Sequence, residues 1–264
     1  HSQKLNDYEF IVIGYLFKGN NKMTKRRRNK IYRYIAIKHF YSLSTYLIPL
    51  FALALLVFGS YGAVGGLYLA PADYQQGDAF RIIYVHVPSA FLSLFIYFIM
   101  AIFAGISLIF RIKLAELIVS GSVFLGAWFT FLALFTGSVW AKPMWGVWWV
   151  WDARLTSELI LLFLYLGVIA LRSAMPERHM AAQNTAILLI LGLANLPIIH
   201  YSVYWWNTLH QGATIHFLSP SLIERSMLYP LLAMIVAFIS FYLIVLLLNI
   251  RCEILEQSIK IHEV

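Results

Sequence analysis

Five of the eight tryptophans in this chain of 264 residues lie within one twelve-residue stretch, from position 140 to position 151. Indole offers a large flat apolar surface with a single N–H donor at its edge. Four of these residues recur at spacings that would place most of them on one face of a short helix: Trp145, Trp148, Trp149 and Trp151. An aromatic belt at a membrane surface is the alternative, but a belt accounts for one or two tryptophans rather than this density. We therefore expect a short interfacial helix that presents these four residues as a tryptophan platform for a flat ligand.

Two histidines are expected beside this platform. His86 lies just before Pro88 at the start of one hydrophobic stretch, and His200 follows Pro197 at the end of another. A single histidine at such a boundary is usually an interfacial hydrogen-bonding residue. Two at similar depth, next to a planar aromatic surface, favour a porphyrin, because neutral imidazole is a common ligand of haem iron. His86 and His200 are the predicted axial ligands.

Charged residues flank the platform. Asp152 directly precedes a hydrophobic stretch, so it is expected either to cap the following helix or to take part in binding. Haem propionates require cations at the water boundary, and Arg81, Lys142 and Arg154 are the ones available there. The role of Glu158, which falls inside a hydrophobic stretch, is left open.

Zinc is the competing metal. A closed zinc site needs four ligands at characteristic spacing, whereas His200, His210 and His216 are ten and six residues apart with no cysteine nearby. The roles of His210 and His216 are left open. Cys252 is the only cysteine, which excludes a disulfide within the chain and covalent haem attachment at a Cys-x-x-Cys-His motif. A bound haem is therefore expected to be non-covalent haem b.

The composition indicates the elements that must position these groups. The chain is 61% hydrophobic and 12% charged, with a mean hydropathy of +0.75, which is typical of an integral membrane protein. A membrane-spanning helix needs about 20 apolar residues. Six stretches qualify, at 46–69, 87–110, 114–138, 155–173, 184–203 and 227–250. The predicted fold is all-α, with six transmembrane helices and no soluble domain.

Lysine and arginine indicate the orientation of these helices. One side of the predicted membrane carries sixteen of these residues and the other carries four, so the positive-inside rule places both termini in the cytoplasm. The six-span domain is then 46–250, and its outer loops are 70–86, 139–154 and 204–226. Residues 1–45 form a basic cytoplasmic segment, of which 1–22 are expected to be an extension because Met23 directly precedes the basic run. Residues 251–264 form a cytoplasmic tail. The net charge of +8 is attributed to topology and acidic lipid contact rather than to nucleic acid.

The motif from Trp145 to Thr156, WGVWWVWDARLT, resembles the tryptophan-rich WWD signature of haem-handling proteins. Its flanking segments resemble cytochrome c maturation protein C, the haem exporter protein C family. They are APADYQQG at 70–77, YVHVP at 84–88, GSVWAKPM at 137–144 and IHYSVYWWNTLHQ at 199–211. The resemblance covers roughly residues 45 to 250.

The resemblance implies a six-span protein that holds haem at the outer face of the bacterial inner membrane, with the mitochondrial inner membrane as the alternative. It implies delivery of haem to a periplasmic chaperone, cytochrome c maturation protein E (CcmE). The implied partners are an ATP-binding cassette pair, maturation proteins A and B (CcmA and CcmB), and the small membrane protein D (CcmD). Carried over, His86 and His200 are the axial ligands, and the four platform tryptophans with Asp152 form the haem surface. The chain has no Walker motif, so energy is expected from a partner and not from an activity of its own.

Two other functions fit some of these features. A membrane cytochrome of the b type would exchange electrons with a quinone, but such proteins stack histidine pairs at two depths and only one outer pair is present. A permease subunit without a cofactor is the other alternative, and the tryptophan density disfavours it.

Overall fold

The computed structural model describes the backbone of residues 25–206, 208–210 and 223–262, and the side chains of residues 39–206, 208–210 and 223–256. The chain divides into two units, His1–Phe40 and Tyr41–Val264. All of the site residues predicted from the sequence belong to the second unit. His216 lies outside the described residues.

Six helical segments in the described part of the chain are long and apolar enough to cross a membrane, which confirms the predicted all-α, six-span fold. Helix α2 (Lys25–Val64) continues into a π-helical turn, η1 (Gly65–Leu69), and a 3-10 turn, η2 (Asp78–Ile82), leads into α3. The remaining helices are α3 (Ile83–Phe110), α4 (Lys113–Trp145), α5 (Ala153–Ala174), α6 (Arg178–Gly192), α7 (Asn195–Trp205) and α8 (Arg225–His262).

The fifth predicted span, 184–203, is interrupted and forms two helices, α6 and α7. Pro197 has no N–H to donate to the carbonyl of Leu193, so a continuous α-helix would lose a hydrogen bond there. The backbone instead tightens, and the amides of Leu193 and Ala194 bond to carbonyls three residues earlier. Asn195 follows the break, and its side chain donates to the carbonyl of Ser157 on α5 at 2.8 Å.

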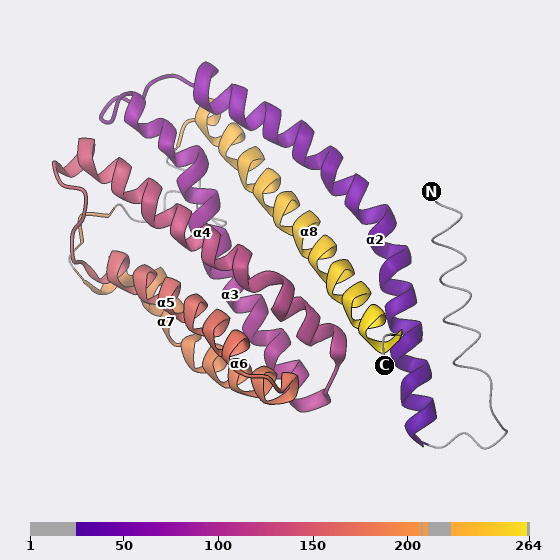
Figure 1. Ribbon diagram of the computed structural model, residues 1–264. Coiled ribbons are helices and arrows are strands. Elements are labelled where there is room, and N and C mark those ends of the chain that lie inside the picture. Colours follow the sequence, from indigo (N-terminus) through magenta and orange to yellow (C-terminus); the bar gives the residue numbers. More distant parts are fainter. Residues whose placement is uncertain (1–24, 207, 211–222, 263–264) are drawn as a thin grey trace. The chain divides into compact units, whose positions relative to one another are not determined.

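Helix α3 packs against α4, α6 and α8, and α5 packs against α4, α6 and α7 (Figure 1). The helices approach closely where glycine faces an aromatic ring. A Cβ added to Gly126 on α4 would lie 2.2 Å from the ring of Tyr165 on α5. The close α4–α5 contact matters for function because the tryptophan segment joins these two helices.

The tryptophan segment differs from the predicted short interfacial helix. Helix α4 runs beyond its predicted end at residue 138 as far as Trp145, and Gly146 then ends it in the left-handed conformation, with φ 77° and ψ −4°. Left-handed glycine is a common helix terminator because it has no Cβ to clash. Residues 147–152 are not helical. The platform tryptophans therefore occupy the end of one helix and an extended connection to the next.

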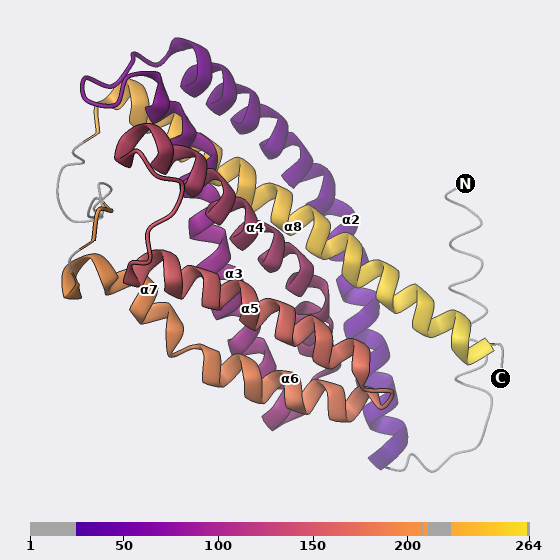
Figure 2. The same cartoon turned by 60° about the vertical axis from the view of Figure 1, so that its left-hand side comes forward.

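Figures 1 and 2 both show the start of α3, the end of α4, the start of α5 and the end of α7 at the same end of the helical bundle. This tryptophan end carries most of the residues that the sequence singled out. The opposite end carries the short connections between α3 and α4 and between α5 and α6.

Candidate functional site

His86, in the first turn of α3, is held by helix α4. Its Nδ1 lies 3.1 Å from the carbonyl oxygen of Ala133 and 3.1 Å from Oγ1 of Thr136. A carbonyl only accepts hydrogen bonds, so Nδ1 must carry the proton. Among the described residues Nε2 has no hydrogen-bond partner, and its lone pair is available. This is the tautomer that suits a metal ligand, since metal-bound histidines usually donate through the other nitrogen.

The ring of Trp140 supports His86 from the side. The two ring centroids are 5.6 Å apart in an edge-to-face arrangement. The indole N–H of Trp140 donates to Oε1 of Gln76 at 3.0 Å, which ties the end of α4 to the loop before α3. The orientation of His86 is therefore fixed by contacts on two sides.

His210, to which the sequence assigns no role, lies against the start of α5. Its Nδ1 is 3.1 Å from Oδ2 of Asp152, and its ring meets that of Trp145 edge to face at 4.9 Å. Thr208 also donates to Oδ2 of Asp152. The carboxylate accepts from Nδ1, so His210, like His86, has an Nε2 without a partner in the described part of the chain.

Asp152 performs the predicted capping role and a second one. Its Oδ1 accepts from the amide of Leu155 at 2.8 Å, as expected of a helix N-cap. Its Oδ2 accepts hydrogen bonds from Thr208 and His210. The same side chain therefore starts α5 and orients an imidazole.

The surroundings of Asp152 and His210 determine whether each side chain is charged. Burial raises the pKa of Asp152, but hydrogen bonds from Thr208, the Leu155 amide and His210 outweigh it, so the net pKa lies below its ordinary value of 3.8. Burial lowers the pKa of His210 below 6.5, and the Asp152 carboxylate only partly opposes this. At neutral pH the pair is an ionised carboxylate with a neutral imidazole.

His86, His210 and Arg154 lie close enough for their charges to interact. They come from α3, from residues 208–210 and from the first turn of α5 respectively. The structure therefore gathers two oriented imidazoles and one guanidinium at the tryptophan end.

The four platform tryptophans differ in their surroundings. Trp148 and Trp151 are exposed. The rings of Trp149 and Trp151 meet edge to face at 5.5 Å. The indole Nε1 of Trp149 is buried and has no hydrogen-bond partner within the described residues. A buried donor without a partner costs free energy, so this N–H is suited to a ligand atom.

The three predicted propionate cations are not equivalent. Arg81 pairs with Asp78 at 3.0 Å and donates to the carbonyl of Gly66. Lys142 donates to the carbonyl of Gly146 at 2.9 Å. Arg154 is partly buried, and its guanidinium makes no hydrogen bond or direct ion pair in the described part of the chain. Arg154 is therefore the cation whose donors are available.

His200, the second predicted ligand, lies on α7 apart from this cluster. Its side chain is exposed, and its ring meets that of Tyr201 edge to face at 4.8 Å. No hydrogen bond to another described residue fixes its tautomer, and it is not among the groups whose charge acts on His86. In the described part of the chain, His200 makes no hydrogen bond or ring contact with His86, Asp152 or the platform tryptophans.

Glu158 lies one turn of α5 below Arg154 and is buried. Ser93 on α3 donates to its Oε1 at 2.7 Å, and Tyr165 donates to the Ser93 carbonyl at 2.8 Å. The charge of Glu158 also acts on Arg154. Glu158 therefore links α5 to α3 and acts electrostatically on Arg154.

The sequence profile of the family described as heme exporter protein C matches residues 30–264. Heme exporter protein C of Haemophilus influenzae is 52% identical over 214 residues, which are 81% of this chain and 87% of the relative. That of Escherichia coli is 56% identical over 174 residues, covering 66% of this chain and 71% of the relative. That of Bradyrhizobium diazoefficiens is 44% identical over 224 residues, 84% of each chain. The residues matched by the family profile include every group of the candidate site.

Proposed function

This chain belongs to the heme exporter protein C family, a haem-handling membrane component of cytochrome c maturation, and we propose that it holds haem b non-covalently at its tryptophan end and delivers it to a haem chaperone. The observation that carries this proposal is the pair of imidazoles with matched tautomers. Among the described residues, His86 and His210 each donate through Nδ1 and keep Nε2 free, beside an aromatic surface. Each imidazole would then coordinate haem iron through Nε2.

His210 replaces His200 as the second ligand in this proposal. The support is the orientation of His210 by Asp152, its contact with Trp145 and its position within electrostatic range of His86. His200 has none of these contacts within the described residues. The pair His86 and His200, predicted from sequence, is the alternative, and single variants of the three histidines distinguish them.

Two further groups fit the porphyrin. The N–H of Trp149 and the guanidinium of Arg154, both without a partner in the described part of the chain, are donors that a haem carboxylate accepts. Trp145, Trp148 and Trp151 would provide flat apolar surface for the ring. Haem binding would give each of these donors a partner.

The membrane context of the proposal follows from the distribution of charge. Sixteen lysines and arginines on one side and four on the other support an orientation with the tryptophan end in the periplasm and both termini in the cytoplasm. We propose the bacterial inner membrane as the location. The proposed acceptor is CcmE, and the proposed complex contains the cassette subunits CcmA and CcmB and the small protein CcmD.

Copurification with the apo-chaperone tests delivery directly. The complex is purified with haem bound, and the haem spectrum of each component is recorded before and after ATP is added. We expect haem to stay with this chain until ATP is added and then to appear in the chaperone, because energy comes from the cassette partner. Fast reduction of the haem by a quinol, with no transfer to the chaperone, would instead support an electron-carrying cytochrome.

A further inference from the structure

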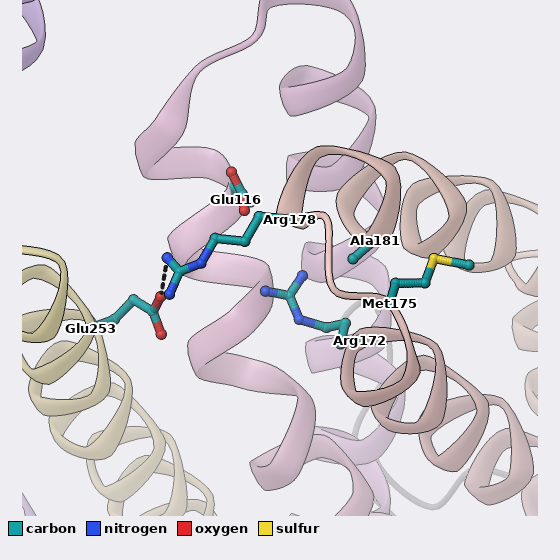
Figure 3. A pocket seen from close by; sticks show the side chains of 6 residues that line it. All are labelled: Glu116, Arg172, Met175, Arg178, Ala181 and Glu253. Carbon is teal, nitrogen blue, oxygen red and sulfur yellow. Dashed lines mark hydrogen bonds and ion pairs between the residues drawn. The ribbon is translucent and has the colours of Figure 1, made fainter. Parts of the chain in front are cut away.

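A polar cavity lies at the end of the bundle opposite the tryptophans. It has a volume of about 200 Å³ and opens between the ends of four helices. Figure 3 shows its lining side chains, which are Glu116 on α4, Arg172 on α5, Met175 after α5, Arg178 and Ala181 on α6, and Glu253 on α8. The haem proposal uses none of these residues.

The two arginines that line this cavity differ in their partners. Lys113 pairs with Glu116 at 2.9 Å, and Arg178 pairs with Glu253 at 3.1 Å. Arg172 interacts with both carboxylates only at longer range and makes no hydrogen bond or direct ion pair within the described residues. Among the described residues that line the cavity, two arginines face two glutamates, and Arg172 is the arginine without a direct ion pair.

A second donor without a partner among the described residues shares a smaller cavity with Arg172. A smaller cavity adjoins the first, and its lining includes Arg172, Glu116 and Thr185 on α6. Thr185 is 1% exposed, and its Oγ1 has no hydrogen-bond partner among the described residues. A buried hydroxyl without a partner is unfavourable. Arg172 lines both cavities, and Thr185 lines only the smaller one.

We propose that this cavity binds the phosphodiester group of an acidic membrane lipid, with the Arg172 guanidinium as its main ligand and Arg178 and Thr185 as supporting donors. Guanidinium binds phosphate oxygens through two parallel hydrogen bonds. A phosphodiester carries one negative charge and would give the Arg172 guanidinium a direct anionic partner. A dianionic phosphate would meet repulsion from Glu116 and Glu253. The cavity also lies at the ends of membrane-spanning segments, where lipid headgroups are found.

Native mass spectrometry of the full chain tests the lipid site. The protein is reconstituted in nanodiscs that contain phosphatidylglycerol and phosphatidylcholine in equal amounts, then released, and the retained lipids are counted. We expect one phosphatidylglycerol to be retained in preference to phosphatidylcholine. Arg172→Gln should reduce this preference about tenfold, the effect of losing one charge-assisted contact. Thr185→Val should reduce it less.

Arg111→Gln is the matched control, because Arg111 is an exposed arginine at the same end that does not line either cavity. Equal retention by Arg172→Gln and Arg111→Gln, or no preference in the unaltered chain, would overturn the proposal. If Arg172→Gln does not fold, Arg172→Lys is used instead. Lysine keeps the positive charge but cannot make two parallel hydrogen bonds to a phosphate, so a partial loss of the preference for phosphatidylglycerol is expected. Displacement of the lipid by inorganic phosphate would show that free phosphate, and not a lipid, is the ligand.

Discussion

Asp152 and His210 are 58 residues apart in the chain, and Oδ2 of the aspartate accepts a hydrogen bond from Nδ1 of the histidine at 3.1 Å. The other carboxylate oxygen caps α5. This contact joins the start of α5 to the segment that follows α7, and it leaves Nε2 of His210 free of any partner among the described residues. It couples the local stability of a helix to the orientation of a proposed haem ligand.

Replacing Asp152 by asparagine separates these two roles. Asparagine is a good N-cap, so the stability of α5 should change little. The charge that orients His210 is lost, and removal of such a supporting partner typically weakens metal binding about 10–100-fold. Haem titration of the purified variant measures this loss. Asp152→Ala should show the same haem defect and in addition lose about 1 kcal/mol of unfolding free energy. If Asp152→Asn kept full haem affinity, Asp152 would serve only as the cap of α5 and would have no role in haem binding.

The pH dependence of haem binding follows from the lowered pKa of His210. The neutral imidazole binds iron, and burial keeps His210 neutral below its ordinary pKa of 6.5. Haem occupancy should therefore persist as the pH falls through 6.5 and decline only at lower pH, when His210 becomes protonated. Since the Asp152 charge raises the pKa of His210, Asp152→Asn should move this decline to still lower pH. The Soret absorbance, normalised to its value at neutral pH, measures both curves. If the decline in Asp152→Asn instead occurred at higher pH, the proposed interaction between Asp152 and His210 would be contradicted.

Arg154 should contribute to haem affinity more than the other cations at the tryptophan end. Arg154→Gln removes a guanidinium whose donors are otherwise unused within the described residues, and an affinity loss of about tenfold is expected. Arg81→Gln is the control, because the donors of Arg81 already bind Asp78 and the Gly66 carbonyl. Equilibrium haem binding compares the two variants. Equal losses would mean that the propionates do not select Arg154.

Gly146 should be required for the shape of the tryptophan segment. Its φ of 77° disfavours residues with a Cβ, so Gly146→Ala should lower the unfolding free energy by about 1 kcal/mol and weaken haem binding through displaced tryptophans. Gly105 in α3 is the control, because an added Cβ there meets open space. Gly105→Ala should be neutral or slightly stabilising. Thermal unfolding measures both effects, and equal effects of the two substitutions would argue against a conformational role for Gly146.

The sequence predicts the six spans well because twenty or so apolar residues have few alternatives in a bilayer. It does not predict the end of α4. Hydropathy falls at residue 138, but backbone hydrogen bonding continues until Gly146 ends the helix. The break before Pro197 is foreseeable from the missing N–H of proline, although the hydropathy of that stretch is continuous.

The site is predicted only in part. His86, Asp152, Arg154 and the tryptophans are evident from residue type and spacing. The position of His210 depends on a contact across 58 residues, which no local pattern encodes. One signal was available: an N-capping carboxylate uses one oxygen, and its other oxygen requires donors, which the segment containing Thr208 and His210 provides.

The most direct test of the proposed haem site is the Soret spectrum of three single variants, His86→Ala, His210→Ala and His200→Ala, purified under identical conditions. We predict that His86→Ala and His210→Ala each lose or shift the Soret band through loss of an axial ligand, while His200→Ala retains the spectrum of the unaltered chain. Loss of the band in His200→Ala together with a normal spectrum in His210→Ala would contradict the proposed ligand pair.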